Sequence, residues 1–510
     1  MKKSIKFVAA VLAAGLACTS FVGCKGRKSP NSATDIEISF WEGSFGTAFM
    51  KDIVSGFSAK YPEYKVNLRT SKNAQTIANT LQKRKNDTTD IYFNQISVFT
   101  NYTDLFADLS EIATETIPGE TKSISGKYDK SLYNSLKNEN GELKTLGWAG
   151  STTGIFYYAD VLEDEGIDVP RTTDELEDLV TSLGNKKAFA QLKDARMGYY
   201  QYLVKAWMAQ YAGLEYYNNN WLQLKDDSGK TPSKDVYLSE TDGRKQALEV
   251  LGAILKSKTV IEDPDKYKVA RYFNLGDAVM MVNGNWVFGE VDELKEKNVK
   301  MMRTPVISAL AEKLDTVADD AELSALVAAI DNVLDNVLDN GAAASLTGSG
   351  YDVSQADWDK VYSARTMIYN NGSEHAMIVN KYTNAMDGVK KFIQYYYSDE
   401  GLAKFVNATH YSANANLTDE TLVNTSGWTD HEKEQYARSK TNTNVTDGNA
   451  TSPVFSKTAT LHLYGTVDVV GKLVTTNNPQ NATELWTAFK NNVNATTGWA
   501  TWLKNAGIKG

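Results

Sequence analysis

The sequence predicts an α/β fold, because its apolar residues switch between the spacing of a strand and the spacing of a helix. Ile36, Ile38 and Phe40 alternate with polar residues, as in a half-buried strand. Apolar residues then recur every fourth position from Phe45 to Phe57, as on one helix face. The chain has 510 residues, which is too long for one hydrophobic core and indicates two or three domains.

The next elements complete a strand-helix-strand unit. Pro62 ends the first helix, and the alternating stretch 64–68 predicts a second strand. Because a helix joins the two strands, they should be parallel. Apolar spacing predicts another helix over 74–81, and the run 90–94 predicts a third strand.

Two segments follow the carboxyl ends of these strands, where open parallel sheets bind ligands. They are Trp41-Glu42-Gly43-Ser44 and Asn94-Gln95. Both are predicted pocket segments.

The middle of the chain contains a predicted crossing between lobes near residue 150. Residues 147–154 are small and polar apart from Trp148, and a strand follows at 155–158. Thr172 and Glu175 have the spacing of a capping box, which predicts that a helix begins there. We expect the return crossing at Met301–Pro305, because proline favours extended geometry in the residue before it.

Two later segments are predicted from their spacing and composition. Apolar residues at three- and four-residue intervals predict one core-facing helix over 323–337. The Asn- and Thr-rich stretch 441–449 predicts a loop.

The N-terminus has the features of a lipoprotein signal. Three lysines precede a short apolar run, which is too short to span a membrane. Cys24 follows Phe21-Val22-Gly23 and resembles the cysteine of a bacterial lipobox, with Cys18 as the alternative. We therefore predict a signal peptide over 1–23, lipidation at Cys24 and a flexible tether over 24–34. No cysteine follows Cys24, so a disulfide framework is excluded.

The composition limits the partners and the chemistry. The net charge is −9, and nucleic-acid binding needs clustered Lys and Arg, so we expect no nucleic-acid partner. The chain holds 27 Tyr and 10 Trp but only 4 His, which disfavours a histidine-based metal or catalytic centre. We expect no metal and no cofactor. The aromatic side chains supply flat, amphipathic binding faces.

Four stretches in one order resemble the extracellular solute-binding proteins of carbohydrate ABC transporters, the group that includes maltose-binding protein. The opening strand 36–41 is similar to the start of that family. Residues 154–176 resemble its "YNKDLFEKAGI" block, and residues 273–286, ending in Asn-Gly-Asn-Trp, resemble its "F..G.AAM...G.W" block. Residues 388–401 are similar to its "FI.F..SDEG" block. The sequence departs from the family by an insertion between 305 and 372 and by a long tail after Ala413.

The resemblance implies a two-lobed periplasmic-binding-protein-like fold of type II, with a ligand cleft at a multi-crossing hinge. We expect lobe 1 to comprise 35–150 plus 304–402, and lobe 2 to comprise 151–303 plus 403–510. The family's ligand contacts carry over onto matching positions, together with Asn94 from the strand-end argument. The expected ligand-binding residues are Trp41, Glu42, Ser44, Asn94, Trp148, Ser151, Tyr199, Tyr200, Asn283, Gly284 and Trp286.

The resemblance also implies a function. The expected protein is a monomeric, lipid-anchored receptor on the extracytoplasmic face of a bacterial membrane, delivering a sugar or oligosaccharide to an ABC permease. Two alternatives stay open from the residues alone. One is a glycan-capturing surface lipoprotein without a transporter. The other is a secreted glycoside hydrolase, although no motif places its pair of carboxylates.

Overall fold

The computed structural model describes residues 32–138, 140–194, 197–256, 258–340, 353–447, 463–475 and 477–505. The predicted signal peptide, Cys24 and the tether up to residue 31 lie outside these ranges. Among the helices that are described, none is both long and apolar enough to cross a membrane.

Lobe 1 is built on a five-stranded mixed sheet in the order β2-β1-β3-β11-β4. β1 pairs in parallel with β2 and β3, which confirms the predicted strand-helix-strand unit, and β11 runs antiparallel. The elements of lobe 1 are β1 (Asp35–Trp41), α1 (Ala48–Lys60), β2 (Lys65–Ser71), α2 (Ala74–Leu81), β3 (Ile91–Gln95), α3 (Ser110–Thr114), α4 (Ile124–Lys127), α5 (Lys130–Ser135), β4 (Leu146–Gly147), β11 (His375–Val379), α16 (Met386–Tyr396) and α17 (Asp399–Thr409).

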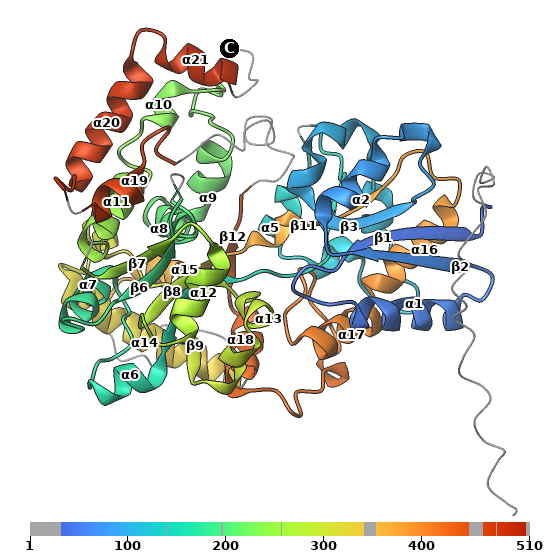
Figure 1. The fold of residues 1–510 in the computed structure, drawn as a ribbon, viewed down its shortest axis with the longest axis horizontal. Helices are drawn as coiled ribbons and strands as arrows, with labels where there is room; N and C mark the ends of the chain where they lie inside the picture. Colours follow the sequence, from blue (N-terminus) through green and yellow to red (C-terminus); the bar gives the residue numbers. More distant parts are fainter. Residues whose placement is uncertain are drawn as a thin grey trace, which may run out of the picture.

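Lobe 2 contains a second five-stranded sheet, in the order β7-β6-β8-β5-β9, beside lobe 1 (Figure 1). Its strands and first helices are β5 (Thr153–Tyr158), α6 (Ala159–Asp164), α7 (Thr173–Ser182), β6 (Phe189–Leu192), α8 (Tyr200–Ala212), α9 (Leu214–Tyr216), α10 (Lys234–Tyr237), α11 (Arg244–Ile254), β7 (Val260–Asp263), α12 (Lys266–Asn274), β8 (Met280–Gly284), α13 (Val287–Glu290) and β9 (Val299–Met301). The later helices are α14 (Asp320–Asn340), α15 (Gln355–Thr366), α19 (Val469–Val474), α20 (Ala482–Asn494) and α21 (Gly498–Asn505). Thr172 caps α7 by accepting a hydrogen bond from the Glu175 N–H, as predicted, but the Glu175 side chain accepts from the Arg171 N–H, so the reciprocal bond of a capping box is not formed.

The two lobes have separate hydrophobic cores. Two segments belong to a different lobe from the one that the sequence analysis predicts. The described parts of the stretch 304–366, predicted in lobe 1, pack into the core of lobe 2 through α14 and α15. The stretch 403–428, predicted in lobe 2, packs into the core of lobe 1 through Phe405 and Trp428. The chain therefore returns to lobe 1 after residue 369 rather than at Met301–Pro305, because Val306 and Ile307 are buried in lobe 2.

Three crossings join the lobes. The first lies between β4 and β5, and the second between β10 (Met367–Tyr369) and β11. The third runs through α18 (Asp430–Ser439) to β12 (Thr443–Val445). β12 pairs in parallel with β10, so the segment predicted as a loop over 441–449 contains a strand. Backbone hydrogen bonds with β10 define this strand. Its residues are mostly polar, so the sequence shows no alternation of apolar residues that would predict a strand.

The Asn370 side chain connects all three crossings. Its Oδ1 accepts hydrogen bonds from the N–H of Ser151 at 3.3 Å and of Gly372 at 2.7 Å. Its Nδ2 donates to Asn444 Oδ1 at 2.8 Å. Asn370 is only 6% exposed, so these bonds satisfy polar groups that water does not reach.

Asn414 packs between the backbones of the first two crossings. Its Nδ2 donates to the Gly372 carbonyl at 3.0 Å. A Cβ at Gly147 would lie 2.1 Å from the same Nδ2, and a Cβ at Gly372 would lie 2.3 Å from Asn414 Oδ1. Both positions therefore need glycine, because the Asn414 amide lies too close to leave room for a Cβ.

We expect Gly147→Ala to lower the free energy of unfolding by about 1–3 kcal/mol, because the added methyl group overpacks this contact. Chemical denaturation measures the change. The penalty should shrink when Gly147→Ala is made in an Asn414→Ala background, where the clashing amide is absent. An equal penalty in both backgrounds would contradict this account of the hinge.

Candidate functional site

Four aromatic side chains gather where lobe 2 faces the hinge, and we call them the aromatic platform: Tyr199, Tyr202, Trp286 and Tyr369. Tyr202 stacks on Tyr199 at 5.4 Å between ring centroids and on Tyr369 at 5.0 Å. Trp286 meets Tyr199 and Tyr202 edge-on, at 6.0 and 6.3 Å. Tyr199 and Trp286 are partly exposed, so the platform offers accessible ring surface.

The end of β8 determines where the Trp286 indole lies. The strand ends at Gly284, and Trp286 sits directly before α13. A Cβ at Gly284 would lie 1.9 Å from the indole ring. The indole therefore folds back over a glycine that has no side chain to obstruct it.

Two carboxylates border the platform. Asp447 accepts hydrogen bonds from Lys205 Nζ at 2.6 Å and from the Tyr369 hydroxyl at 2.9 Å. Glu374 accepts from the Ser97 N–H at 3.2 Å, which joins the second crossing to lobe 1. Burial raises the pKa of Glu374, and the negative charge of Asp447 raises it further. Both carboxylates also contribute to raising the pKa of Tyr202, for which burial is the main cause.

Lobe 1 contributes the segment after β1. The Trp41 indole stacks on the His375 ring at 5.9 Å, and its Nε1 donates to the Lys72 carbonyl at 3.2 Å. Glu42 and Ser44 are partly buried. A Cβ at Gly289 of α13 would lie 2.6 Å from the Ser44 carbonyl, so the two lobes touch here.

The structure separates the predicted site residues into two groups. Tyr199, Gly284 and Trp286 come together at the platform, with Gly284 beneath the indole, and Trp41, Glu42 and Ser44 lie on the segment of lobe 1 that contacts α13. The other predicted residues are at most 3% exposed and present almost no surface to a ligand; they are Asn94, Trp148, Ser151, Tyr200 and Asn283.

Trp148 and Asn94 are predicted ligand contacts whose side chains the structure uses inside lobe 1. Its indole is fully buried in the core of lobe 1, edge-on to Phe40 and Phe45 and stacked on Phe49. Asn94 is used internally, because its Nδ2 donates to the Ala74 carbonyl at 2.9 Å.

Sequence reasoning missed Tyr202, Tyr369, Glu374 and Asp447. Tyr202 lies two residues beyond the predicted pair, on the first turn of α8. The other three lie on or beside the hinge segments, whose positions depend on pairing between distant parts of the chain. No local pattern marks them.

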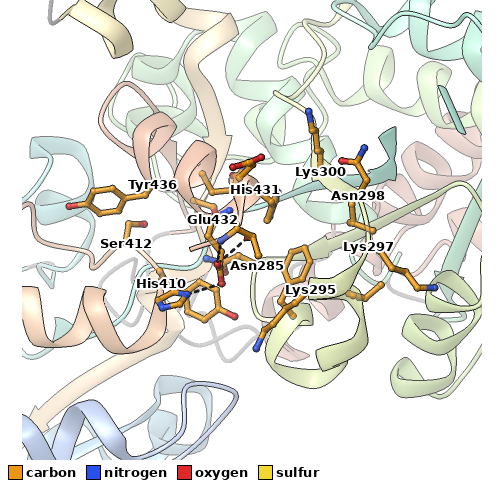
Figure 2. A pocket seen from close by; sticks show the side chains of 18 residues that line it. Asn285, Lys295, Lys297, Asn298, Lys300, His410, Ser412, His431, Glu432 and Tyr436 are labelled. Atoms are coloured by element: carbon orange, nitrogen blue, oxygen red, sulfur yellow. Dashed lines mark hydrogen bonds and ion pairs between the residues drawn. The ribbon is translucent and has the colours of Figure 1, made fainter. Parts of the chain in front are cut away.

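A cavity of about 390 Å³ lies between the lobes, beside Phe288 of α13 (Figure 2). It is lined by Asn285 and Phe288 from lobe 2, by His410 to Ser412 after α17, and by the first turns of α18. The segment 294–300 also lines it, with Lys295, Lys297 and Lys300, so the lining mixes polar and apolar side chains, and Trp286 is not part of it.

The sequence pattern of the family described as bacterial extracellular solute-binding protein matches residues 52–432, well over half of the chain. The chain belongs to the bacterial extracellular solute-binding proteins. As a member of this family of binding proteins, it acts outside the cytoplasm. No curated protein sequence matches it significantly.

Solved structures of solute-binding proteins share the two-lobed fold. The apo form of RafE from Streptococcus pneumoniae is 16% identical, with 91% of this chain and 98% of RafE covered at a TM-score of 0.57. A family 1 extracellular solute-binding protein from Bifidobacterium longum subsp. infantis is 14% identical, with 92% and 99% covered at 0.54. The GacH receptor of Streptomyces glaucescens is 13% identical, with 90% and 98% covered at 0.52.

Trp148 and Trp286 of this solute-binding protein should respond differently to truncation. We expect Trp148→Ala to cost about 3–5 kcal/mol of folding stability, because it leaves a cavity in a closed core. Trp286→Ala should cost clearly less, because part of its ring is already exposed. Thermal unfolding of the ligand-free variants measures both. Equal losses would place Trp286 in the core as well.

Buried histidine should make stability pH-dependent. Burial lowers the pKa of His375 to about 4, against a usual value near 6.5. Between these values the unfolded chain binds the proton and the folded chain does not, so stability falls as the pH falls from about 6.5 to about 4. We expect this slope to be shallower in His375→Leu, measured by denaturation at several pH values. An unchanged slope would show that His375 does not contribute.

Proposed function

We propose that this solute-binding protein is a carbohydrate receptor that binds its ligand between the lobes against the aromatic platform. The observation that carries the proposal is the accessible face of Trp286 and Tyr199, in the same aromatic cluster as Tyr369, whose hydroxyl donates to Asp447. Sugar rings present apolar C–H faces and a rim of hydroxyls, so a sugar site combines flat aromatic surface with hydrogen-bonding carboxylates or amides.

The structural neighbours support a carbohydrate ligand. RafE has been solved in complex with raffinose, and the GacH receptor in complex with acarbose. Another neighbour is a chitin oligosaccharide binding protein. These neighbours are 13–15% identical to this chain, so the sugar itself does not transfer.

In the proposed site, Trp286 stacks on a sugar ring while Asp447 and Glu374 accept hydrogen bonds from hydroxyls. Trp41, Glu42 and Ser44 approach from lobe 1 when the lobes close. Closure around a hinge is favoured by a ligand that contacts both lobes, because such a ligand binds the closed form more tightly.

We further propose that the receptor is a monomer that is anchored through a lipid on Cys24 and delivers its ligand to an ABC permease. The tether after Cys24 would let the lobes reach a membrane partner. A glycan-capturing lipoprotein without a permease would use the same site. Loss of sugar uptake in a strain lacking the receptor would favour delivery to a permease, and unchanged uptake would favour the glycan-capturing lipoprotein.

We expect the protein to bind sugar without converting it. A raised pKa at Glu374 near a second carboxylate is also what a glycoside hydrolase would need for a general acid. Incubation with a sugar that raises the melting temperature should therefore return the sugar unchanged. Product formation that Glu374→Gln or Asp447→Asn abolishes would favour the hydrolase instead.

Removal of the Trp286 ring should weaken sugar binding. We expect Trp286→Ala to raise the Kd about tenfold or more, since a stacking contact contributes roughly 1–3 kcal/mol. Trp286→Phe should lose less, because part of the flat face remains. Calorimetric titration measures the change, and Tyr382→Ala, an exposed aromatic site in lobe 1, is the control. Unchanged affinity in Trp286→Ala would remove this residue from the site.

Lipidation should depend on Cys24 alone. We expect Cys24→Ala to abolish metabolic labelling with a fatty acid, while Cys18→Ala leaves labelling intact. Labelling that survives Cys24→Ala would move the anchor to Cys18.

A further inference from the structure

The helix α18, in the third crossing, contacts lobe 1 through one of its faces. Glu432, Tyr436 and Lys440 are four residues apart, so their side chains lie on one side of the helix. Glu432 Oε1 lies 2.9 Å from Nδ1 of His410, at the end of α17. The Tyr436 hydroxyl and Lys440 Nζ both donate to Glu420, at 2.7 and 2.6 Å. These polar contacts fasten α18 to lobe 1.

A second face of α18 contacts lobe 2. His431 and Arg438 are separated by about two helical turns. The His431 ring lies 4.7 Å from the Phe288 ring and 6.2 Å from the Phe156 ring, between centroids. Arg438 Nη1 donates to the Met301 carbonyl at 2.8 Å. Phe156, Phe288 and Met301 belong to one core cluster of lobe 2, so α18 joins the two lobes.

The cavity beside α13 interrupts the contact between α18 and lobe 2. It is lined by residues of 429–436 and by the segment 294–300 of lobe 2. Figure 2 shows His410 and Tyr436 on one side of it and Asn298 on the other. Protein cores are close-packed, so a space of about 390 Å³ leaves this interface less tightly packed than the core of either lobe.

His431 is held without charge in this interface. Burial lowers its pKa to about 4, against a usual value near 6.5. The positive charges of Arg438 on the same helix and of Lys300 on β9 add to this effect, and the negative charge of Glu432 opposes it. The rings that face His431 from α13 and β5 carry no charge. The imidazole is therefore neutral at neutral pH.

Other charged groups at this interface have partners of their own. Lys295 pairs with Asp292 at 2.9 Å, and Glu434 pairs with Arg438 on α18. Lys297 Nζ donates to a backbone carbonyl of α12. Asp292 and Glu434 are thus engaged with cations other than His431.

We propose that α18 is a latch between the lobes, which moves with lobe 1 and is released from lobe 2 when His431 takes up a proton. The Phe288 and Phe156 rings solvate an imidazolium poorly, whereas water solvates it well once α18 has moved away from them. Acid therefore favours separated lobes. The latch does not depend on which solute the platform binds.

The size of the effect follows from proton binding to the two forms. Released His431 has the usual pKa near 6.5, whereas the latched form holds it at about 4. Between these values only the released form binds the proton, so each unit by which the pH falls shifts the equilibrium up to about tenfold toward release. A solute that contacts both lobes would bind more weakly in acid, because it prefers the closed form.

Small-angle X-ray scattering of the mature protein at pH 7.5 and pH 5.0 tests the latch without any added solute. We expect the radius of gyration to rise at pH 5.0, and we expect no rise in His431→Leu, whose side chain cannot take up a proton. His375→Leu is the matched control and should keep the full rise. Burial lowers the pKa of His375 to about 4 as well, but this ring packs inside lobe 1 against Phe45 and Trp148.

A constant radius in the wild-type protein would overturn the proposal, as would a rise that persists in His431→Leu or disappears in His375→Leu. A rise that persists in His431→Leu would assign the acid response to another pair, such as His410 and Glu432. His431→Gln, which also stays uncharged, replaces His431→Leu if that variant does not fold. Far-UV circular dichroism of each sample at pH 5.0 separates lobe opening from unfolding.

Discussion

The arrangement of the two lobes depends on the buried amide of Asn370. The Asn370 side chain accepts hydrogen bonds from backbone N–H groups of the first and second crossings and donates one to Asn444 on the third. The Asn370 backbone adds to this, since its N–H donates to the Val445 carbonyl at 2.8 Å. An apolar residue here would leave buried N–H groups without partners, at a cost of about 1–3 kcal/mol each.

This junction explains where the site lies. Each lobe has its own core and is expected to move as a rigid body, so relative motion concentrates in the short crossings. Tyr369 and Glu374 flank the crossing that contains Asn370, and Asp447 follows the strand paired to it. The hinge therefore places groups of the proposed site at the position where the lobes meet, and movement of the lobes changes their surroundings. The same geometry leaves the cavity beside α13, with walls from both lobes.

The sequence predicted those features that local patterns determine. The spacing of Ile36 to Phe57 identified β1 and α1, and the capping residue Thr172 located the start of α7. The resemblance of residues 273–286 to a family block pointed to Trp286, and the structure shows that its indole lies over Gly284. The burial of Trp148 could not be predicted, since Phe40, Phe45 and Phe49 surround it only after the sheet forms. The placement of 304–366 and of Asp447 also depends on long-range packing, which leaves no periodic signal in the chain.

The central claim is that a ligand held between the lobes closes them around the Asn370 junction. Small-angle X-ray scattering of the mature protein, with and without a saturating sugar that raises its melting temperature, tests this directly. We expect the radius of gyration to fall when the sugar binds, while the cores of the individual lobes stay unchanged. Identical scattering curves from the ligand-free and the saturated protein would contradict the account.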